Sequence, residues 1–77
     1  MKTELFCRVG AAAFGDRWQS AMARCLGVTP RTVARWVSDD VVPDDMVDRL
    51  RPVVRSRIEA LELVRKALWS DREVARG

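Results

Sequence analysis

The sequence predicts a small all-α domain of four to five helices, the last of which is longer than the others. Apolar residues recur every three or four positions along most of the chain, as they do on one face of a helix. Glycine and proline separate these periodic stretches and mark the turns. The 77 residues suffice for one helical core without a disulfide or metal to stabilise it.

A first helix is predicted to begin at Thr3, whose side chain can cap it, and to end near Gly15. Asp16 is expected to cap a second helix, and Gln19 three residues later completes a capping-box pattern. Trp18 is expected to pack the first helix against the second. The apolar positions of the first helix are Leu5, Phe6, Val9, Ala12 and Ala13.

Residues 19–38 predict two helices joined by a sharp turn. Gly27 follows an apolar periodic run and can adopt the left-handed conformation that ends a helix. Ala23, four residues earlier, is small enough for two helices to cross closely. Thr29 and Pro30 suit the N-cap and the first position of the following helix. The apolar residues expected between the two helices are Met22, Leu26, Val28, Val33 and Trp36.

The second of these helices is amphipathic, with arginines opposite its apolar residues. Val33, Trp36 and Val37 fall on one side, and Arg31 and Arg35, four residues apart, share the other. A structural hairpin with solvated arginines would show the same charge pattern. Because the glycine, the alanine, five apolar positions and the threonine-proline start all occur in register, we favour a DNA-binding helix-turn-helix.

This segment resembles the helix-turn-helix of the phage repressor and Cro-type transcription regulators, closely in residues 19–38 and loosely in the flanking helices. The resemblance implies that Arg31, Thr32 and Arg35 read bases in the major groove. Pro30 departs from the family pattern, in which a polar reader is common at that position, so more of the reading falls to the two arginines. Arginine pairs with guanine O6 and N7, and we therefore expect guanines in each half-site. The residues expected to contact the DNA backbone are Gln19, Arg17, Thr29 and Ser38.

The net charge of +3 is unevenly distributed. Residues 1–38 carry six basic and two acidic side chains, and residues 51–77 carry seven basic and four acidic ones. Such a basic motif region favours phosphate and predicts that affinity falls with added salt. Residues 39–50 contain five aspartates and one arginine. This acidic segment is expected to face away from DNA or to meet the basic surface of another copy, unless it is only a solvated turn and helix start.

A fourth helix is expected near residues 44–50, with Pro43 at its first position. Pro52 should interrupt or kink the pattern, because it removes a helical hydrogen bond. A fifth helix is expected over residues 52–69, followed by a frayed polar tail.

An apolar stripe runs along these last helices. Its members are Val47, Leu50, Val54, Ile58, Leu61, Val64 or Arg65, and Leu68. So small a core would not cover all of it, and we expect Ile58, Leu61 and Leu68 to form a two-fold dimer contact. The alternative is a monomer in which the helix folds back on the motif. We therefore divide the chain into a helix-turn-helix DNA-binding domain, residues 1–50, and a C-terminal dimerisation helix with its tail, residues 51–77.

These features favour a small dimeric repressor or autorepressor that reads a roughly palindromic double-stranded DNA operator, with half-sites about 34 Å apart. The alternative is an antitoxin or phage-encoded protein-binding module that uses the C-terminal helix. We do not expect an enzyme, since the chain has no histidine or tyrosine and no glycine-rich phosphate loop.

No cofactor or metal is expected. Cys7 and Cys25 have no histidine to join them, which excludes zinc, and their places on apolar faces favour buried thiols over a disulfide or redox switch. The sequence has no stretch of about 20 apolar residues and no signal-peptide core at its N-terminus, so no membrane contact and a cytoplasmic location are expected.

Overall fold

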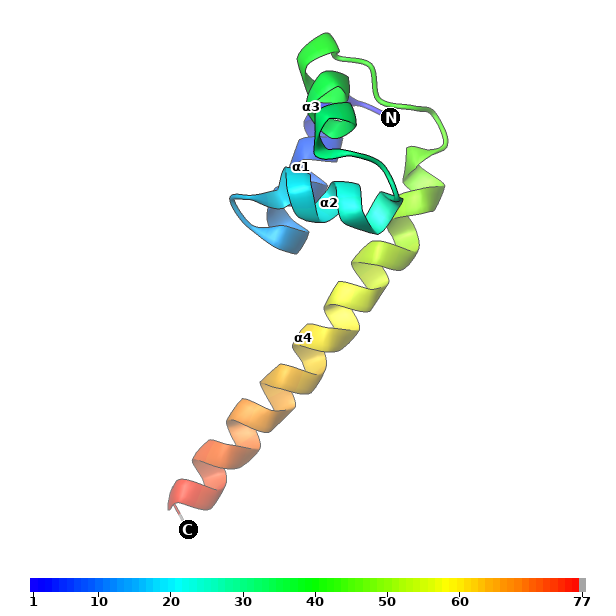
Figure 1. Cartoon of the computed structure of the whole chain (residues 1–77). Coiled ribbons are helices and arrows are strands. Elements are labelled where there is room, and N and C mark those ends of the chain that lie inside the picture. The colour runs from blue at the N-terminus through cyan, green and yellow to red at the C-terminus, as the bar shows by residue number, and fades with distance from the viewer. Residues whose placement is uncertain (77) are drawn as a thin grey trace.

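Four α-helices make up the part of the chain that the computed structural model describes, namely the backbone of residues 1–76 and the side chains of residues 1–71. They are α1 (Thr3–Phe14), α2 (Trp18–Leu26), α3 (Pro30–Asp39) and α4 (Met46–Arg76). The first three helices gather at one end, and α4 extends away from them (Figure 1). The all-α fold with a longer last helix is thus confirmed.

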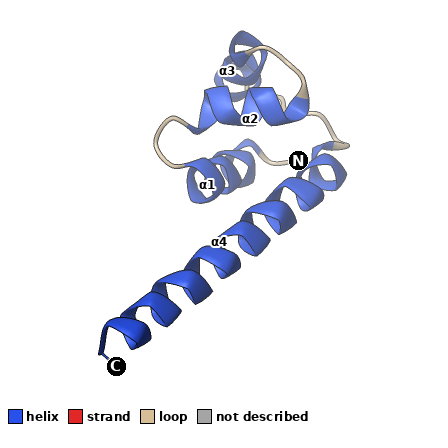
Figure 2. Cartoon of the chain, turned by 60° about the horizontal axis from the view of Figure 1, so that its bottom comes forward, coloured by secondary structure: helices blue, strands red, loops and turns tan. Residues whose placement is uncertain are grey.

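The core lies between the first three helices and the start of α4. Its buried side chains are Phe6, Met22, Ala23, Leu26, Val33, Val42, Met46 and Leu50. Among the described side chains, none after Leu50 is buried. We call the part of the chain that contains this core, residues 1–50, the head. Viewed as in Figure 2, the head has α3 farthest from α4, with α2 and α1 between them.

Aromatic side chains fix the packing of α1 against its two neighbours. The Phe6 ring meets Trp18 edge to face at a centroid distance of 5.6 Å, and it meets Trp36 in the same way at 6.0 Å. The Trp18 ring lies directly over Gly10, where a Cβ atom would come within 2.1 Å of it. Gly10 is therefore required for the close approach of Trp18 to α1, which confirms the expected role of Trp18.

Two predicted helix caps are wrong. The N-cap of α1 is Lys2, whose carbonyl accepts from Phe6 N at 3.0 Å, and Thr3 is the first helical residue. The N-cap of α2 is Arg17, which receives no side-chain cap, because Asp16 lies one residue too early in the turn that follows Gly15. Gly15 does end α1, as expected.

The linker between α3 and α4 begins with a left-handed residue. Asp40 has φ 57° and ψ 39°, and the N–H group of the next residue, Val41, donates to Trp36 O at 3.0 Å. This turn brings Val42 and Met46 into the core. The helix then begins at Met46 rather than near Asp44, which lies in the preceding turn.

A single helix, α4, replaces the two predicted for this region. Pro52 lies inside it without ending it. Because proline has no N–H group, Pro52 cannot donate the helical hydrogen bond to the carbonyl of Asp48 in the first turn. Asp48 is exposed, so water can bind its carbonyl instead. The helix also continues past Trp69 to Arg76, through the segment expected to fray, while Gly77 lies outside the described residues. In the described part of the chain, no helix is long and apolar enough to cross a membrane.

Two arginines of α4 join it to the ends of α2 and α1. Arg49 Nη2 donates to Leu26 O, at the end of α2, at 2.8 Å. Arg57 Nε donates to Ala13 O, near the end of α1, at 2.9 Å, and its guanidinium lies 5.3 Å from the centre of the Phe14 ring. Both arginines therefore satisfy carbonyls that a helix leaves without an internal partner.

Beyond Arg57, the apolar residues of α4 are exposed to solvent. We define the distal stripe as Ile58, Leu61, Val64 and Leu68, which share one face and are 54–62% exposed. The helix does not fold back over the head (Figure 1). Beside the stripe, Arg65 donates to Glu62 Oε2 at 2.9 Å, and this hydrogen bond together with the glutamate charge raises the pKa of Arg65.

The two cysteines are less buried than the sequence predicts. Cys7 is half-buried and Cys25 is exposed, and both are free thiols. Cys25 lies to the side of the Met22 and Leu26 positions on α2, and it lines a shallow hollow next to Pro52 of α4 instead of entering the core.

Candidate nucleic-acid interface

A tight turn joins α2 to α3. Gly27 ends α2 in the left-handed conformation, with φ 72° and ψ 28°, and Val28 N donates to Ala23 O at 3.0 Å. Ala23 itself is fully buried. The close α2–α3 pairing predicted from Gly27 and Ala23 is thus confirmed.

Thr29 caps α3 and engages Thr32. The Thr29 hydroxyl accepts from Thr32 N at 3.2 Å, and the two threonine Oγ1 atoms are 2.9 Å apart. Pro30 occupies the first helical position, as expected. Both hydroxyls therefore lie at the start of α3 and already share a hydrogen bond, which orients them in the absence of any ligand.

The face of α3 that points away from the core carries the two predicted base-reading arginines. Arg31, Arg35 and Ser38 are all exposed and follow one another at spacings of four and three residues. On the other face Val33 is fully buried, and Trp36 is half-buried with its ring against Phe6. The buried side fixes the rotation of α3 and so directs the arginines to solvent.

Ala34 belongs to the same exposed face and was not anticipated. It lies between Arg31 and Ser38, three residues from the first and four from the second, and is exposed. A methyl group at this place can contact the methyl group of thymine. The helical spacing places Ala34 on this face, but alanine is common in helices and its residue type does not indicate a binding role.

The arginines around the motif have no acidic partner among the described side chains. Arg17, Arg31 and Arg35 are exposed, and the ion pairs of the described region lie elsewhere, at Arg8, Arg51, Arg65 and the N-terminus. Guanidinium groups without an internal carboxylate keep their full attraction for phosphate. The three arginines are therefore not held in ion pairs, although Asp16 adjoins Arg17 and Asp39 lies one helical turn from Arg35.

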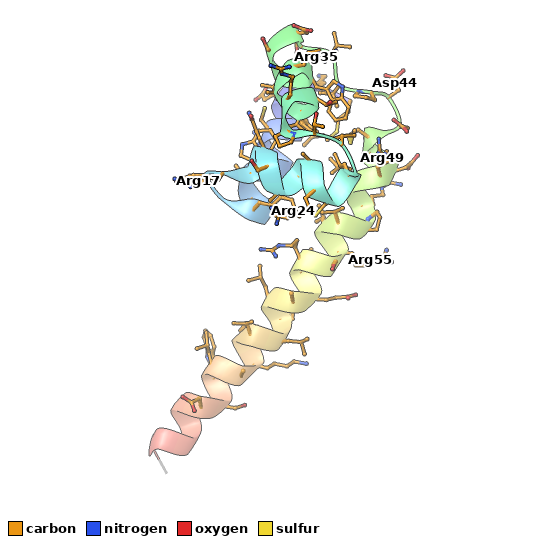
Figure 3. All side chains as sticks on the ribbon, viewed as in Figure 1. Arg17, Arg24, Arg35, Asp44, Arg49 and Arg55 are labelled. Carbon is orange, nitrogen blue, oxygen red and sulfur yellow. The ribbon has the colours of Figure 1, made fainter. Side chains whose placement is uncertain are left out.

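The other residues predicted to contact the DNA backbone differ in position and in exposure. Arg17 lies in the loop before α2, on the far side of the head from Asp44 of the acidic segment (Figure 3). Gln19 is half-buried in the first turn of α2, so less of its side chain is free for a phosphate. Arg24 lies on the side of α2 that faces α4, away from α3 (Figure 3). Arg17 is thus separated from Asp44, whereas Arg35 lies on α3, the helix that leads directly into the acidic segment.

Comparison of the chain with protein-family models, with curated proteins and with solved structures finds no match. No relative therefore assigns a role to any residue of this surface. Its function is inferred from the helix geometry and the side chains described above.

Proposed function

We propose that the protein is a sequence-specific regulator of transcription that binds double-stranded DNA by inserting α3 into the major groove. The observation that carries the proposal is the exposed row of Arg31, Arg35 and Ser38, held in place by the buried opposite face of α3. A helix fits the major groove, and bidentate arginine contacts there distinguish guanine from other bases.

In this proposal the residues divide into two groups. Arg31, Arg35 and Thr32 read base edges. The side chains that position α3 by contacts to phosphate are Gln19, Arg17, Thr29 and Ser38. Such backbone contacts fix the register on the duplex and carry no sequence information themselves.

One α3 reads only a short sequence, so we also propose that two copies bind a roughly palindromic operator as a homodimer. Occupying such an operator would repress transcription, including that of the protein's own gene. The role requires no cofactor or catalytic group, and we propose that it is carried out in the cytoplasm.

A second candidate function is a protein-binding module of the antitoxin type. The exposed distal stripe on α4 favours it, because a single apolar helix face is a common way to grip another protein. The two functions are compatible, since one chain could bind DNA with α3 and a partner protein with α4.

The test of DNA binding is selection of sites from random duplex DNA at one fixed salt concentration, followed by affinity measurements on the selected site. Arg31→Ala and Arg35→Ala should each weaken specific binding by about 1 to 3 kcal/mol, because each removes a base contact. Arg24→Ala is the matched control: Arg24 is equally exposed but lies away from α3, so specific binding should persist. Circular dichroism checks that all three variants stay folded.

Two results would overturn the proposal. One is the failure of selection to enrich any sequence. The other is unchanged affinity in both α3 variants, which would mean that another surface binds the DNA.

A further inference from the structure

The isolated chain exposes more surface than a compact protein of its size. Its accessible surface is 6023 Å², whereas about 4,700 Å² is typical of a compact monomer of 8.7 kDa, which leaves an excess of about 1,300 Å². The radius of gyration of 15.9 Å likewise exceeds the value of about 11.5 Å for a compact chain of this length. A protein interface of ordinary size removes about 800 Å² from each partner. The excess is therefore large enough to supply one such interface.

Part of this exposed surface is a groove between α1 and α4. Most of its lining is apolar, with Leu5, Val9 and Ala12 on α1 and with Val47 and Val54 on α4. The charged side chains that also line it are Arg8, Arg51, Arg55, Arg57 and Glu59. Two adjoining hollows of about 640 and 390 Å³ form it, and both are lined by Val9, Val54 and Ile58. We call this surface the α1/α4 groove.

The α1/α4 groove runs without a break into the distal stripe. Ile58 lines both hollows and Leu61 lines the smaller one, and both residues belong to the stripe. One molecule therefore presents an apolar groove at one end and an unpartnered apolar helix face at the other, joined into one surface.

We propose that the distal half of α4 from a second copy lies in the α1/α4 groove, antiparallel to α4, while its own groove receives the distal half of the first. The contact is reciprocal, so it closes on a dimer and leaves neither groove nor stripe open. Each copy supplies an amphipathic helix to an apolar groove, which is an established mode of recognition.

The lengths of the two surfaces agree. The described distal residues 61–71 span about 15 Å of helix, and the α4 wall of the groove, residues 47–61, spans about 21 Å. The distal segment can therefore lie along the groove over its whole length.

The charges favour the antiparallel orientation. Residues 47–58 of α4 carry four arginines and one aspartate, whereas residues 59–77 carry four acidic and four basic side chains. Antiparallel packing sets the strongly basic proximal half opposite the neutral distal half, whereas parallel packing would set the two basic halves against each other.

This inference deepens the proposed function, because it rests on the pairing of two copies and adds which surfaces pair. It does not require DNA to be present. Its test is therefore self-association of the full chain without DNA, which can fail or succeed independently of α3.

Sedimentation equilibrium should show wild-type dimers at micromolar concentration. Leu68→Glu should weaken association by about 100-fold or more, because it replaces an apolar side chain of the contact by a carboxylate that must lose its hydration there. Leu63→Glu is the matched control: Leu63 is also exposed, at 69%, but lies on the opposite side of α4 and lines neither hollow, so the dimer should persist. A wild-type chain that stays monomeric at 100-fold higher concentration would overturn the proposal, as would equal loss in the two variants.

A mixing experiment tests the groove itself. Leu5→Arg alters the groove without touching the distal stripe, and it should be monomeric, whereas Ala11→Arg on the outer side of α1 should not be. A mixture of Leu5→Arg and Leu68→Glu should associate more tightly than either variant alone, because one groove and one stripe of the mixed dimer are both unaltered. Wild-type association of Leu5→Arg, or no gain on mixing, would contradict insertion into the groove.

The two proposals can be separated with a DNA half-site. Leu68→Glu should bind a single half-site with wild-type affinity, since α3 is unchanged. If association occurs but no DNA sequence is selected, the proposed function fails and the dimer stands. If the chain binds a half-site but never associates, the proposed dimer fails and the DNA-binding function of α3 stands.

Discussion

The head and the distal half of α4 contain similar apolar residues at similar helical spacing, yet only those of the head are covered. Leu50 is 3% exposed and Leu61, on the same helix, is 62% exposed. Leu50 belongs to the core cluster, whereas Leu61 lies at the edge of an open hollow beside α1 and is not covered. Periodicity therefore predicts which face of a helix is apolar, but burial depends on whether another element lies opposite that face.

Truncating the same residue type in the two regions should give the largest contrast. Leu50→Ala should lower the free energy of unfolding by about 2 to 5 kcal/mol, because it leaves a cavity in the core. Leu61→Ala should change it by less than about 0.5 kcal/mol in a monomer, as is usual for exposed positions. Urea denaturation measures both, and a Leu68→Glu background keeps every chain monomeric. Equal losses would mean that the distal stripe is covered within one chain.

Arg57 marks the place where the two regions meet. Arg57→Met keeps most of the side-chain volume but removes the hydrogen bond to Ala13 O and the contact of charge with the Phe14 ring, so stability should fall by about 1 to 2 kcal/mol. Arg55→Met, two residues earlier, is the control. Arg55 is exposed and makes no hydrogen bond or ion pair with the described residues, so its loss should cost less than about 0.5 kcal/mol. If thermal and urea denaturation give the same value for both variants, the head does not depend on α4 at this point.

Local signals in the sequence were sufficient to predict the two helices α2 and α3 and the turn between them. The left-handed conformation of Gly27, the cap at Thr29 and the start at Pro30 each depend on a few neighbouring residues, and the structure confirms all three. The exposure of Arg31 and Arg35 follows from helical spacing alone. Their role in reading DNA stays a prediction, because spacing places a side chain and does not name its ligand.

Features set by distant contacts could not be predicted in this way. Arg49 and Arg57 reach carbonyls 23 and 44 residues away in the chain, and no local pattern indicates such partners. Pro52 is a strong local signal for a break, but the one carbonyl that it leaves without a partner belongs to the exposed residue Asp48 in the first turn of α4. Trp18, the first residue of α2, places its ring over Gly10 of α1, a contact eight residues away that the capping pattern at Asp16 does not indicate.

The smallest effect concerns Asp40, where the head itself retains an unfavourable conformation. Asp40 is the one described non-glycine residue with positive φ, and its carboxylate lies at the negative end of the α3 dipole. Asp40→Asn should raise stability by about 0.3 kcal/mol by removing the charge. Asp40→Gly should raise the free energy of unfolding by about 0.5 to 1 kcal/mol, because glycine also adopts the left-handed conformation without steric cost. This net value allows for the greater conformational freedom of glycine in the unfolded chain, which lowers stability.

Comparing the two variants by urea denaturation separates charge from backbone conformation. A larger gain for glycine would show that core contacts of Val42 and Met46 hold Asp40 in a costly conformation, because the chain must turn there for both residues to be buried. Equal gains would assign the whole cost to the charge. In that case the turn would be intrinsically favourable, and the linker would need no help from the core to direct α4 away from α3.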